Sequence, residues 1–462
     1  MAESLIISVS GVRGIVGKTL TAPLATAYGS AFGSFLKEGG SSNYLGHKHP
    51  LKVCIGRDSR PSGPMIQAAV TAGLCRIGAD VVDLGIVTTP TVGIMLRELG
   101  CDGGVVITAS HNPLPYNGIK LLLNNGIAPP PAMAEKIKRR FLEQRLDPVG
   151  SVDCGKVTIN DHADQVHLDK VLSIVDTNAI ARKRFRVVLD SVNGAGGSIG
   201  RQLLDRLGCD VVAVNAEPTG LFAHEPEPTE ANLQSLCDIM RQDDAVVGFA
   251  QDPDADRLAV VDENGVYMGE EYTLALAAQQ VLSQSPGAVA ANLSTSRMID
   301  DIARTVDSRV IRTPVGEAHV AGAMIENNCV IGGEGNGGVI DLRVGPIRDS
   351  LVAMSLILQL MADTGQSISR LAKGFGGYVM FKDKFAIAPK QAHTLIEQTR
   401  SQWPGAHINN SDGCRFDFED AWLHLRLSNT EPIMRLIIEA KDEATVRHYA
   451  QTVFAIRDRM RS

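Results

Sequence analysis

The chain is poor in the features that mark several large classes of protein. It has only 2 Trp and 7 Tyr among 462 residues, so aromatic platforms on which nucleic-acid bases could stack are not expected. The net charge of −7 provides no basic face for a nucleic-acid backbone. Apolar stretches such as 353–362 are far shorter than the roughly 20 residues that a membrane helix needs. We therefore expect neither a nucleic acid nor a membrane as a partner.

Paired cysteines are missing as well. The 8 cysteines are scattered singly, with no C-x-x-C spacing among them. This pattern argues against a disulfide framework and against a zinc site. The opening residues, MAESLIISVSG, lack the basic segment and the long apolar core of a secretory signal. A reducing cytoplasm is the compartment that we expect.

A repeated pattern predicts the fold class. Three segments, which begin near residues 52, 185 and 288, share the order apolar strand, Gly- or Ser-rich turn, helix and second strand. Units of this kind build parallel sheets with helices on their faces. The last quarter differs, because residues 414–427 alternate apolar and polar side chains and 443–460 form an amphipathic helix. The sequence predicts an α/β protein with three tandem related α/β domains, in parallel or mixed sheets, and a C-terminal α+β domain.

The length of the chain supports this division, since 462 residues are too many for one core. The boundaries fall where the patterns change. The expected domains are residues 1–155, 156–265, 266–372 and 373–462.

Three closely spaced carboxylates form the strongest chemical signal. In the segment DPDADR, Asp252, Asp254 and Asp256 are two residues apart, so an extended chain points them to the same side. Three such anions need a cation, and Mg²⁺ takes carboxylate and phosphate oxygens. An EF-hand is excluded because Arg257 stands where its sharp turn requires Gly, and because both flanks are strand-like. A solvated acidic turn is a poor explanation, since both flanks are apolar.

A serine follows a predicted buried strand. The segment 105–113, VVITASHNP, changes abruptly from β-branched residues to Ser110 and His111. Open α/β sheets bind their ligands at the carboxyl ends of strands, although an ordinary turn would have the same composition. Acyl transfer by a Ser-His pair is disfavoured, because adjacent side chains seldom pair and there is no G-x-S-x-G elbow. With the aspartates in the same chain, a phosphorylated Ser110 that completes the metal shell is the better interpretation.

Two further segments suit a phosphorylated sugar. In 426–435, RLSNTEPIMR, two guanidinium groups can grip a phosphate, although a surface turn explains this segment equally well. The segment 332–338, GGEGNGG, lacks the Lys and Ser/Thr order of a P-loop. Its Glu334 would be the side chain that bonds sugar hydroxyls.

Taken together, these segments resemble the α-D-phosphohexomutases, in the order of that family and over nearly the whole chain. The four main matches are Thr108–Pro113 with the phosphoserine loop, Asp252–Arg257 with the metal loop, Gly333–Gly338 with the sugar loop and Arg426–Arg435 with the phosphate loop. Shorter matches are Ser10–Gly14, Gly56–Arg60, Asn117–Lys120, Asn193–Gly196 and Thr313–Gly316.

The resemblance implies a heart-shaped enzyme with one cleft, to which every domain contributes a loop. Phospho-Ser110 would pass its phosphoryl group to a hexose monophosphate, and the bound 1,6-bisphosphate would return its other phosphate. The metal ion, one Mg²⁺ per chain, would be held by the Ser110 phosphate, Asp252, Asp254 and Asp256. A hexose 1,6-bisphosphate would serve as primer.

The resemblance also implies roles for other residues. Those assisting proton transfer or charge neutralisation would be Arg13, His111, Lys120 and Arg257. The sugar would be bound by Thr313, Gly316, Glu334 and Asn336, and the distal phosphate by Arg426, Ser428, Asn429, Thr430 and Arg435. Whether Lys120 or His111 is the base stays open, because lysine can be a base at neutral pH only if burial or nearby cations lower its pKa.

The distal phosphate site must accept either phosphate of the bisphosphate. A flexible loop on a movable domain can do this, and closure of that domain would exclude water. We therefore expect a hinge near residue 372.

One departure from the family bears on the substrate. Many members carry Ser and His in the sugar loop where this chain has Asn336 and Gly338. The GEGNGG loop together with SNTEP resembles the archaeal type of phosphoglucosamine mutase, which predicts conversion of glucosamine 6-phosphate to glucosamine 1-phosphate. Phosphomannomutase or phosphoglucomutase activity would use the same chemistry. A Mg²⁺-dependent sugar phosphatase and a non-catalytic sugar-phosphate-binding protein are the competing hypotheses, and the expected assembly is a monomer or a homodimer.

Overall fold

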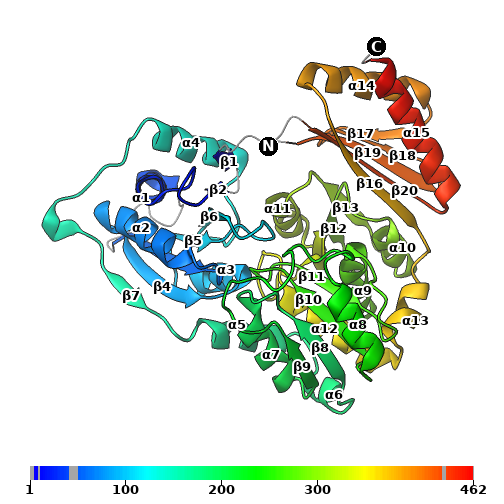
Figure 1. Ribbon diagram of the computed structural model, residues 1–462, viewed down its shortest axis with the longest axis horizontal. Helices are drawn as coiled ribbons and strands as arrows, with labels where there is room; N and C mark the ends of the chain where they lie inside the picture. Colours follow the sequence, from blue (N-terminus) through cyan, green and yellow to red (C-terminus); the bar gives the residue numbers. More distant parts are fainter. Residues whose placement is uncertain (1–4, 9–10, 41–49, 429–432, 461–462) are drawn as a thin grey trace.

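The computed structural model describes residues 5–8, 11–40, 50–428 and 433–460, and it contains four sheets (Figure 1). In Figure 1 the first sheet lies on the left, the second and third lie together at the lower right, and the fourth lies above them. Within the described ranges, no helix is both long enough and apolar enough to span a bilayer. The 8 cysteines are free thiols, and Cys154 is the one that is exposed.

The first sheet has seven strands in the order β1-β2-β6-β5-β3-β4-β7. The strands are β1 (Ile6–Ser8), β2 (Gly11–Ile15), β3 (Lys52–Arg57), β4 (Asp80–Ile86), β5 (Gly103–Ile107), β6 (Tyr116–Leu123) and β7 (Val157–Ile159). The helices are α1 (Ala22–Phe35), α2 (Gly63–Arg76), α3 (Thr89–Glu98) and α4 (Pro131–Leu142). Because β7 pairs with β4, this sheet extends beyond the expected boundary at residue 155.

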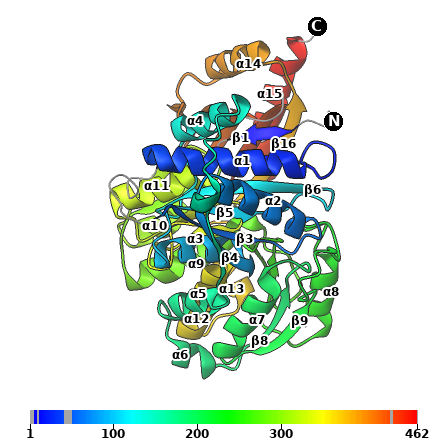
Figure 2. The ribbon, with the colours of Figure 1, turned by 90° about the vertical axis from the view of Figure 1, so that its left-hand side faces the viewer.

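Helices cover both faces of the first sheet. Apolar residues of α1 and α2 form one core with the strands, and those of α3 form another on the opposite face. Glycine lets α1 and α2 approach closely, since a Cβ at Gly73 would overlap the carbonyl oxygen of Thr26. Figure 2 turns this domain toward the viewer, with α1 and α2 side by side.

The second sheet has four strands in the order β11-β10-β8-β9. Its strands are β8 (Arg186–Asp190), β9 (Asp210–Val214), β10 (Val247–Gln251) and β11 (Leu258–Val261). Its helices are α5 (Ala163–Leu172), α6 (Thr177–Ala181), α7 (Gly196–Arg206) and α8 (Gln234–Gln242).

The third sheet has the order β13-β12-β14-β15 and shares one hydrophobic core with the second. Its strands are β12 (Val289–Asn292), β13 (Val310–Thr313), β14 (Ile331–Glu334) and β15 (Gly338–Ile340). Its helices are α9 (Glu270–Gln284), α10 (Met298–Thr305), α11 (Glu317–Asn327), α12 (Ser350–Thr364) and α13 (Ile368–Lys373).

The same four-strand unit occurs once in each of these three sheets. Three parallel strands are followed by an antiparallel one, in the orders β4-β3-β5-β6, β9-β8-β10-β11 and β13-β12-β14-β15. This recurrence confirms the prediction of three related α/β domains. It also places the connection between the third and fourth strand at the same edge of every unit, where the parallel strands have their carboxyl ends.

The fourth sheet is antiparallel and forms the predicted α+β domain. Its order is β16-β20-β19-β18-β17, and its core lies between the sheet and two helices. The elements are β16 (Val379–Ala386), α14 (Pro389–Gln402), β17 (His407–Asn409), β18 (Cys414–Asp417), β19 (Ala421–Leu427), β20 (Ile433–Ala440) and α15 (Glu443–Arg459). The sequence patterns missed β16, β17 and α14.

Polar groups join the fourth domain to the third. The guanidinium of Arg297, before α10, donates to carbonyl oxygens of Phe418 and Ala421 at 2.9 and 3.0 Å. Arg415 reaches in the opposite direction and donates to the carbonyl oxygen of Leu293. These exchanged arginines hold two separately folded units together with hydrogen bonds, a kind of contact that can re-form after a small domain movement.

A long connection in the second domain is pinned to the end of β8. Residues 215–233 contain no helix or strand. The Asp190 carboxylate accepts from Asn215 Nδ2 at 3.1 Å, and its other oxygen lies 3.2 Å from His224 Nε2. Burial lowers the pKa of His224, but the hydrogen bond and charge of Asp190 outweigh it and raise that pKa above its ordinary value.

The His224–Asp190 pair predicts a pH-dependent part of the stability. A raised folded-state pKa means that this contribution is complete below the ordinary histidine pKa of about 6.5 and is lost as the pH rises through the folded-state value. The free energy of unfolding should therefore fall more steeply in the wild type than in His224→Gln as the pH rises above about 6.5. Urea unfolding at a series of pH values measures this pH dependence of the free energy of unfolding. His162→Gln, at an exposed histidine, is the matched control. Equal slopes for wild type and His224→Gln would contradict the prediction.

Candidate active site

The predicted loops occupy equivalent places in the repeated units. Ser110 follows β5, residues 252–257 join β10 to β11, and residues 335–337 join β14 to β15. In each case the loop connects the third strand of the unit to the fourth. Because ligands bind at the carboxyl ends of parallel strands, the common topology directs all three loops to such edges. Contacts between the loops show that the three edges meet.

A buried arginine shapes the loop that carries Ser110. Arg60 is fully buried, and its guanidinium donates to the carbonyl oxygens of Ser110 and Asn112 at 2.6 Å each. It also donates to those of Pro113 and Tyr116 at 3.0 Å. Four carbonyl groups from one loop are thus gathered around one rigid cation. The loop conformation therefore depends on Arg60.

The backbone of Ser110 is strained. Its φ is +49°, a left-handed conformation that non-glycine residues seldom adopt. The Ser110 N–H donates to Thr108 Oγ1 at 2.8 Å, and the Thr108 hydroxyl donates to Asp58 Oδ2 at 2.7 Å. Asp58 in turn accepts from Arg60 Nε at 3.1 Å. Strain of this kind persists where the surroundings over-determine it, as they do in functional loops.

Ser110 lies directly against the aspartates of the second domain. Its Oγ donates to Asp252 Oδ2 at 2.9 Å. Asp252, Asp254 and Asp256 are completely buried, and they offer oxygens that all lie within 4.8 Å of one another. The structure thus joins the two strongest signals of the sequence, which are 142 positions apart.

The aspartate cluster is supported by a neighbouring loop of the second domain and by Thr89 of the first domain. Ala195 N donates to the carbonyl oxygen of Pro253 at 2.8 Å, and a Cβ at Gly194 would lie 2.7 Å from Pro253 Cα. From the first domain, Thr89 donates to Asp254 through its backbone N–H at 2.9 Å and through its hydroxyl at 2.5 Å. The close approach explains why the Asn193–Gly196 segment needs its small residues.

The carboxylates are short of hydrogen-bond donors. Asp254 Oδ1 and Asp256 Oδ1 are buried without a hydrogen-bond partner in the described part of the chain, although Arg257 Nε lies 3.7 Å from Asp256 Oδ1. Burial, followed by the charges of Asp256 and Asp254, raises the pKa of Asp252 to about 7. Unpaired anionic oxygens are costly in a protein interior, and hard oxygen donors of this kind suit a divalent cation. The triad could therefore hold a metal ion.

Cations from three domains surround the triad. Arg257 donates to Asp252 Oδ2 at 3.2 Å through both Nε and Nη2, and Arg348 donates to Asp256 Oδ2 at 2.5 Å. Lys120 Nζ lies 2.7 Å from Asp254 Oδ2 and 3.4 Å from Asp256 Oδ2. Burial opposes the charge of Lys120, but Asp254 and Asp256 outweigh it and raise its pKa. The condition under which Lys120 would be a base, a lowered pKa, is therefore not met in this arrangement.

His111 and Arg13 stand beside the serine. The Nδ1 atom of His111 lies 3.4 Å from Ser110 Oγ, a long contact between adjacent side chains that the sequence pattern disfavours. Burial, together with the charges of Arg257 and Arg13, holds the pKa of His111 well below its ordinary value. Arg13 Nη1 donates to Asn112 Oδ1 at 2.5 Å, within the loop that Arg60 shapes.

The sugar-loop residues gather around Glu334. Its Oε1 accepts from Asn292 Nδ2 at 2.8 Å and from the Gly316 N–H at 3.0 Å, and Asn336 Nδ2 lies 3.5 Å from Oε2. The Thr313 hydroxyl donates to the carbonyl oxygen of Pro314 at 2.9 Å.

The sugar loop rests on the strand that follows the metal loop. The Leu258 N–H donates to the carbonyl oxygen of Gly337 at 3.0 Å. Gly337 has φ +85°, and a Cβ there would overlap the carbonyl oxygen of Leu258. The two loops therefore share a backbone contact, which fixes the distance between them.

The fourth domain presents a row of cations. Arg426 and Arg435 are direct partners on β19 and β20, and Lys384 of β16 is the partner of Arg435 on its other side. Like charges placed directly opposite each other repel, so such a row favours a bound anion. Arg426 Nε donates at 2.6 Å to Asp412, whose carboxylate also accepts from the Val315 N–H at 3.0 Å.

The remaining phosphate-loop residues are only partly described. The Ser428 N–H donates to the carbonyl oxygen of Ile433 at 2.9 Å, which continues the pairing of β19 with β20. Asn429 and Thr430 lie outside the described residues.

Three residues of the site are not predicted by the sequence patterns. Arg60 belongs only to a short match, Lys384 lies on a strand that was not predicted, and Arg348 belongs to none of the motifs. Their partners are far away in sequence: Arg348 contacts Asp256, and Arg60 contacts Ser110. No local pattern could have revealed them.

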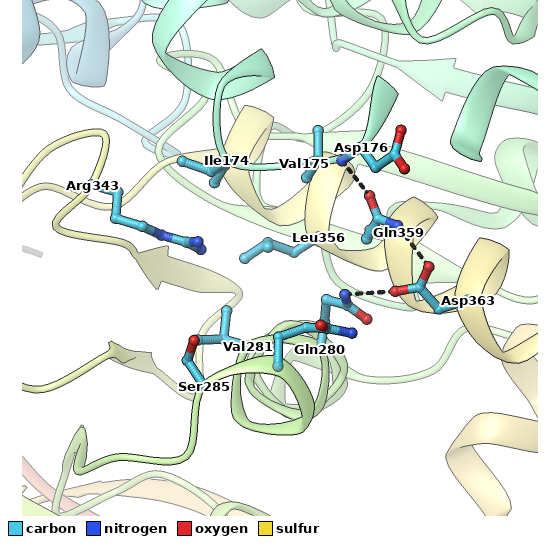
Figure 3. Close-up of a pocket in the computed structure, with 11 residues that line it drawn as sticks. Ile174, Val175, Asp176, Gln280, Val281, Ser285, Arg343, Leu356, Gln359 and Asp363 are labelled. Carbon is cyan, nitrogen blue, oxygen red and sulfur yellow. Dashed lines mark hydrogen bonds between the residues drawn. The ribbon is translucent and has the colours of Figure 1, made fainter. Parts of the chain in front are cut away.

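A separate hollow of about 360 Å³ lies between α9, α12 and the segment that precedes α6 (Figure 3). None of the described candidate site residues lines it. Three of its polar side chains are joined by hydrogen bonds: Gln280 and Gln359 donate to Asp363 at 3.0 and 2.8 Å, and Gln359 accepts from the Asp176 N–H at 2.8 Å. This hollow is therefore separate from the loop cluster.

Comparison with known proteins identifies the family. Models of the phosphoglucomutase/phosphomannomutase alpha/beta/alpha domains I, II and III match residues 5–147, 165–265 and 269–377, and the model of the C-terminal domain matches 382–456. The chain therefore belongs to this family, the α-D-phosphohexomutases, and it is a phosphohexomutase.

Individual relatives extend over the whole chain. A phosphoglucomutase/phosphomannomutase of Thermococcus kodakarensis is 38% identical over 446 residues, which is 96% of each chain. A probable phosphoglucosamine mutase of Methanopyrus kandleri is 36% identical over 95% of this chain and 94% of its own. Among solved structures, a phosphoglucomutase/phosphomannomutase family protein of Burkholderia thailandensis has a TM-score of 0.84 at 28% identity, over 98% of this chain and 97% of that one.

The unpartnered oxygens predict a measurable metal affinity. Asp254→Asn removes one charge while it keeps the shape of the side chain, so the affinity for Mg²⁺ or Mn²⁺ should fall at least about tenfold. Calorimetric titration of the metal alone measures this, and Asp205→Asn on the exposed face of α7 is the matched control. If Asp254→Asn bound the metal as tightly as the wild type, the site would be wrongly placed.

Proposed function

We propose that this phosphohexomutase moves phosphate between O6 and O1 of a hexose phosphate through a phosphoserine at residue 110, with glucosamine 6-phosphate as the preferred substrate. The observation that carries the proposal is the 2.9 Å contact of Ser110 Oγ with Asp252, inside a cluster of buried carboxylates and cations. Phosphate on this oxygen would lie among the groups that neutralise it.

Each half of the reaction exchanges one P–O bond. The bond between phosphorus and Ser110 Oγ breaks while a bond forms to a hydroxyl oxygen of the sugar monophosphate, and the hydroxyl proton ends on Ser110 Oγ. The resulting 1,6-bisphosphate then reorients in the cleft, so that its other phosphate faces Ser110. Ser110 Oγ then takes the other phosphoryl group and releases its proton to the sugar oxygen, so the phosphoenzyme is restored. A hexose 1,6-bisphosphate primes the cycle by phosphorylating Ser110.

The surrounding residues receive roles from their positions. Asp252, Asp254, Asp256 and an oxygen of the Ser110 phosphate would hold a Mg²⁺, which would supply charge neutralisation for the transferring phosphoryl group. We assign proton exchange to His111, because it lies 3.4 Å from Ser110 Oγ, whereas Lys120 is engaged by two carboxylates. Lys120, Arg13 and Arg257 would neutralise charge around the phosphoserine.

The other two loops would hold the sugar. Glu334 and Asn336, supported by the Thr313–Gly316 segment, are assigned to the hydroxyl groups. Arg426, Arg435 and Ser428, with Asn429 and Thr430, are assigned to the phosphate that is not reacting, and Lys384 joins them because it flanks Arg435. An anion site made of cations on a movable domain would accept either phosphate, which the reorientation of the bisphosphate requires. We place the hinge near residue 372, at the C-terminal end of α13.

The proposal of glucosamine 6-phosphate as substrate is based on the named relatives and on the sequence of the sugar loop. The 36% identical Methanopyrus protein is named a probable phosphoglucosamine mutase, and the GEGNGG loop favours the same substrate. The 38% identical Thermococcus protein is named a phosphoglucomutase/phosphomannomutase, so glucose and mannose phosphates are the second candidates.

Ser110→Ala should abolish turnover and leave the fold intact. Removal of a nucleophile costs many powers of ten, so mutase activity should fall at least roughly a thousandfold. ³¹P NMR with Mg²⁺ and a bisphosphate primer separates the 6-phosphate, the 1-phosphate and free phosphate, and glucosamine, glucose and mannose 6-phosphates are compared. The exposed Ser173→Ala is the matched control. Wild-type turnover by Ser110→Ala would refute the assigned role, and free phosphate as the main product would favour a phosphatase.

A further inference from the structure

Arg348 connects two loops that come from different domains. Its side chain is 13% exposed and lies in the connection between β15 and α12. One end of the guanidinium donates to Asp256 Oδ2 at 2.5 Å, and the other donates to Glu334 Oε2 at 2.9 Å. Asp256 belongs to the metal loop and Glu334 to the sugar loop. A single planar cation thus spans the two.

The chemistry of this contact requires arginine. A guanidinium has donors on both ends of a rigid fork, whereas a lysine ammonium is a point charge on a flexible stem. The fork is held in place from its backbone, because the Arg348 N–H donates to Glu317 Oε1 at 2.6 Å. Charge also favours the arrangement, since Asp256, Glu317 and Glu334 outweigh the burial that opposes the cation and raise the pKa of Arg348.

Gly338 gives a second and independent observation. Its φ lies outside the left-handed region, so the backbone conformation does not require glycine there. A Cβ at this position would instead lie 2.9 Å from Arg348 Cγ and closer still to Cδ. The space that a side chain at residue 338 would occupy, next to Glu334, is therefore filled by Arg348. Glycine at position 338 is therefore what leaves room for the side chain of Arg348.

We infer that Arg348 is the positioning residue that sets the sugar loop against the metal loop, and that it replaces a side chain at residue 338 on the wall that faces the sugar. The inference rests on the proposed function for its substrate. Glu334 Oε1 is already engaged by Asn292 and Gly316, and Oε2 accepts its short hydrogen bond from Arg348, at 2.9 Å against 3.5 Å from Asn336. Without the fork, Glu334 and Asp256 would no longer be oriented together.

A double-mutant cycle tests the pairing of Arg348 with Gly338. Gly338→Ala should raise the KM for glucosamine 6-phosphate about tenfold or more, because the new methyl group pushes the guanidinium away from its two carboxylates. Arg348→Ala should have a similar effect. In the double variant the methyl group has room, so it should add little to the effect of Arg348→Ala alone. Additive effects of the two changes would overturn the inference.

Conservative replacement separates positioning from simple loss of charge. Arg348→Lys keeps the charge but can reach only one carboxylate, so the KM should rise about tenfold while kcat changes less. Arg343→Lys is the matched control, since Arg343 lies in the same connection and forms its ion pair with Asp341, a single carboxylate within the described ranges. An Arg348→Lys variant with the KM of the wild type would also overturn the inference. Circular dichroism and the melting temperature show whether each variant is folded.

Two binding measurements keep this test separate from the proposed function. Calorimetric titration with glucosamine 6-phosphate, and with Mn²⁺ alone, reports on the sugar and metal loops without turnover. Weaker binding of both in Arg348→Lys and Gly338→Ala supports the inference even if no mutase activity is found. A wild type that is inactive with every hexose phosphate would sink the proposed function, whereas unchanged binding in both variants would sink the role of Arg348.

Discussion

Three buried carboxylates cannot remain close together without positive charge around them, and the structure of this protein is organised to provide it. Asp252, Asp254 and Asp256 are fully buried, and two of their oxygens accept no hydrogen bond from the described residues. The cations that reach them come from different domains: Lys120 from the first and Arg348 from the third. The proximity of the domains and the chemistry of the loops are therefore consequences of one electrostatic requirement.

The repeated topology explains how loops from three domains reach the same place. In each α/β domain the loop between the third and fourth strand of the unit lies at the carboxyl edge of the sheet. The first such loop carries Ser110, the second the aspartates and the third Glu334. The fourth domain has a different sheet and presents a row of cations instead, Arg426, Arg435 and Lys384. A single architecture thus brings a serine, a carboxylate cluster and Glu334 to one place.

Much of this could be predicted from the sequence, because the strands are apolar and the reactive groups are contiguous. The Asp252–Asp256 spacing and the Ser110 turn are local patterns, and the structure brings both together. Arg60, Arg348 and Lys384 could not be found, since each acts on partners far away in sequence or lies on the half-exposed β16. The electrostatics of Lys120 were equally inaccessible, because they depend on Asp254 and Asp256 and not on its own neighbours. Motifs of neighbouring residues can be recognised in a sequence. Contacts between residues that are far apart in sequence become apparent only in the folded structure.

The proposed mechanism rests on a phosphate that is carried by Ser110 and shared with a metal ion at the aspartates. Electron–nuclear double resonance on the Mn²⁺-loaded phosphoenzyme tests this most directly, with the extent of phosphorylation known from the intact mass. We expect a ³¹P hyperfine coupling to the bound Mn²⁺ that is absent from Ser110→Ala treated in the same way. Full phosphorylation of Ser110 together with tightly bound Mn²⁺ and no ³¹P coupling would contradict the mechanism.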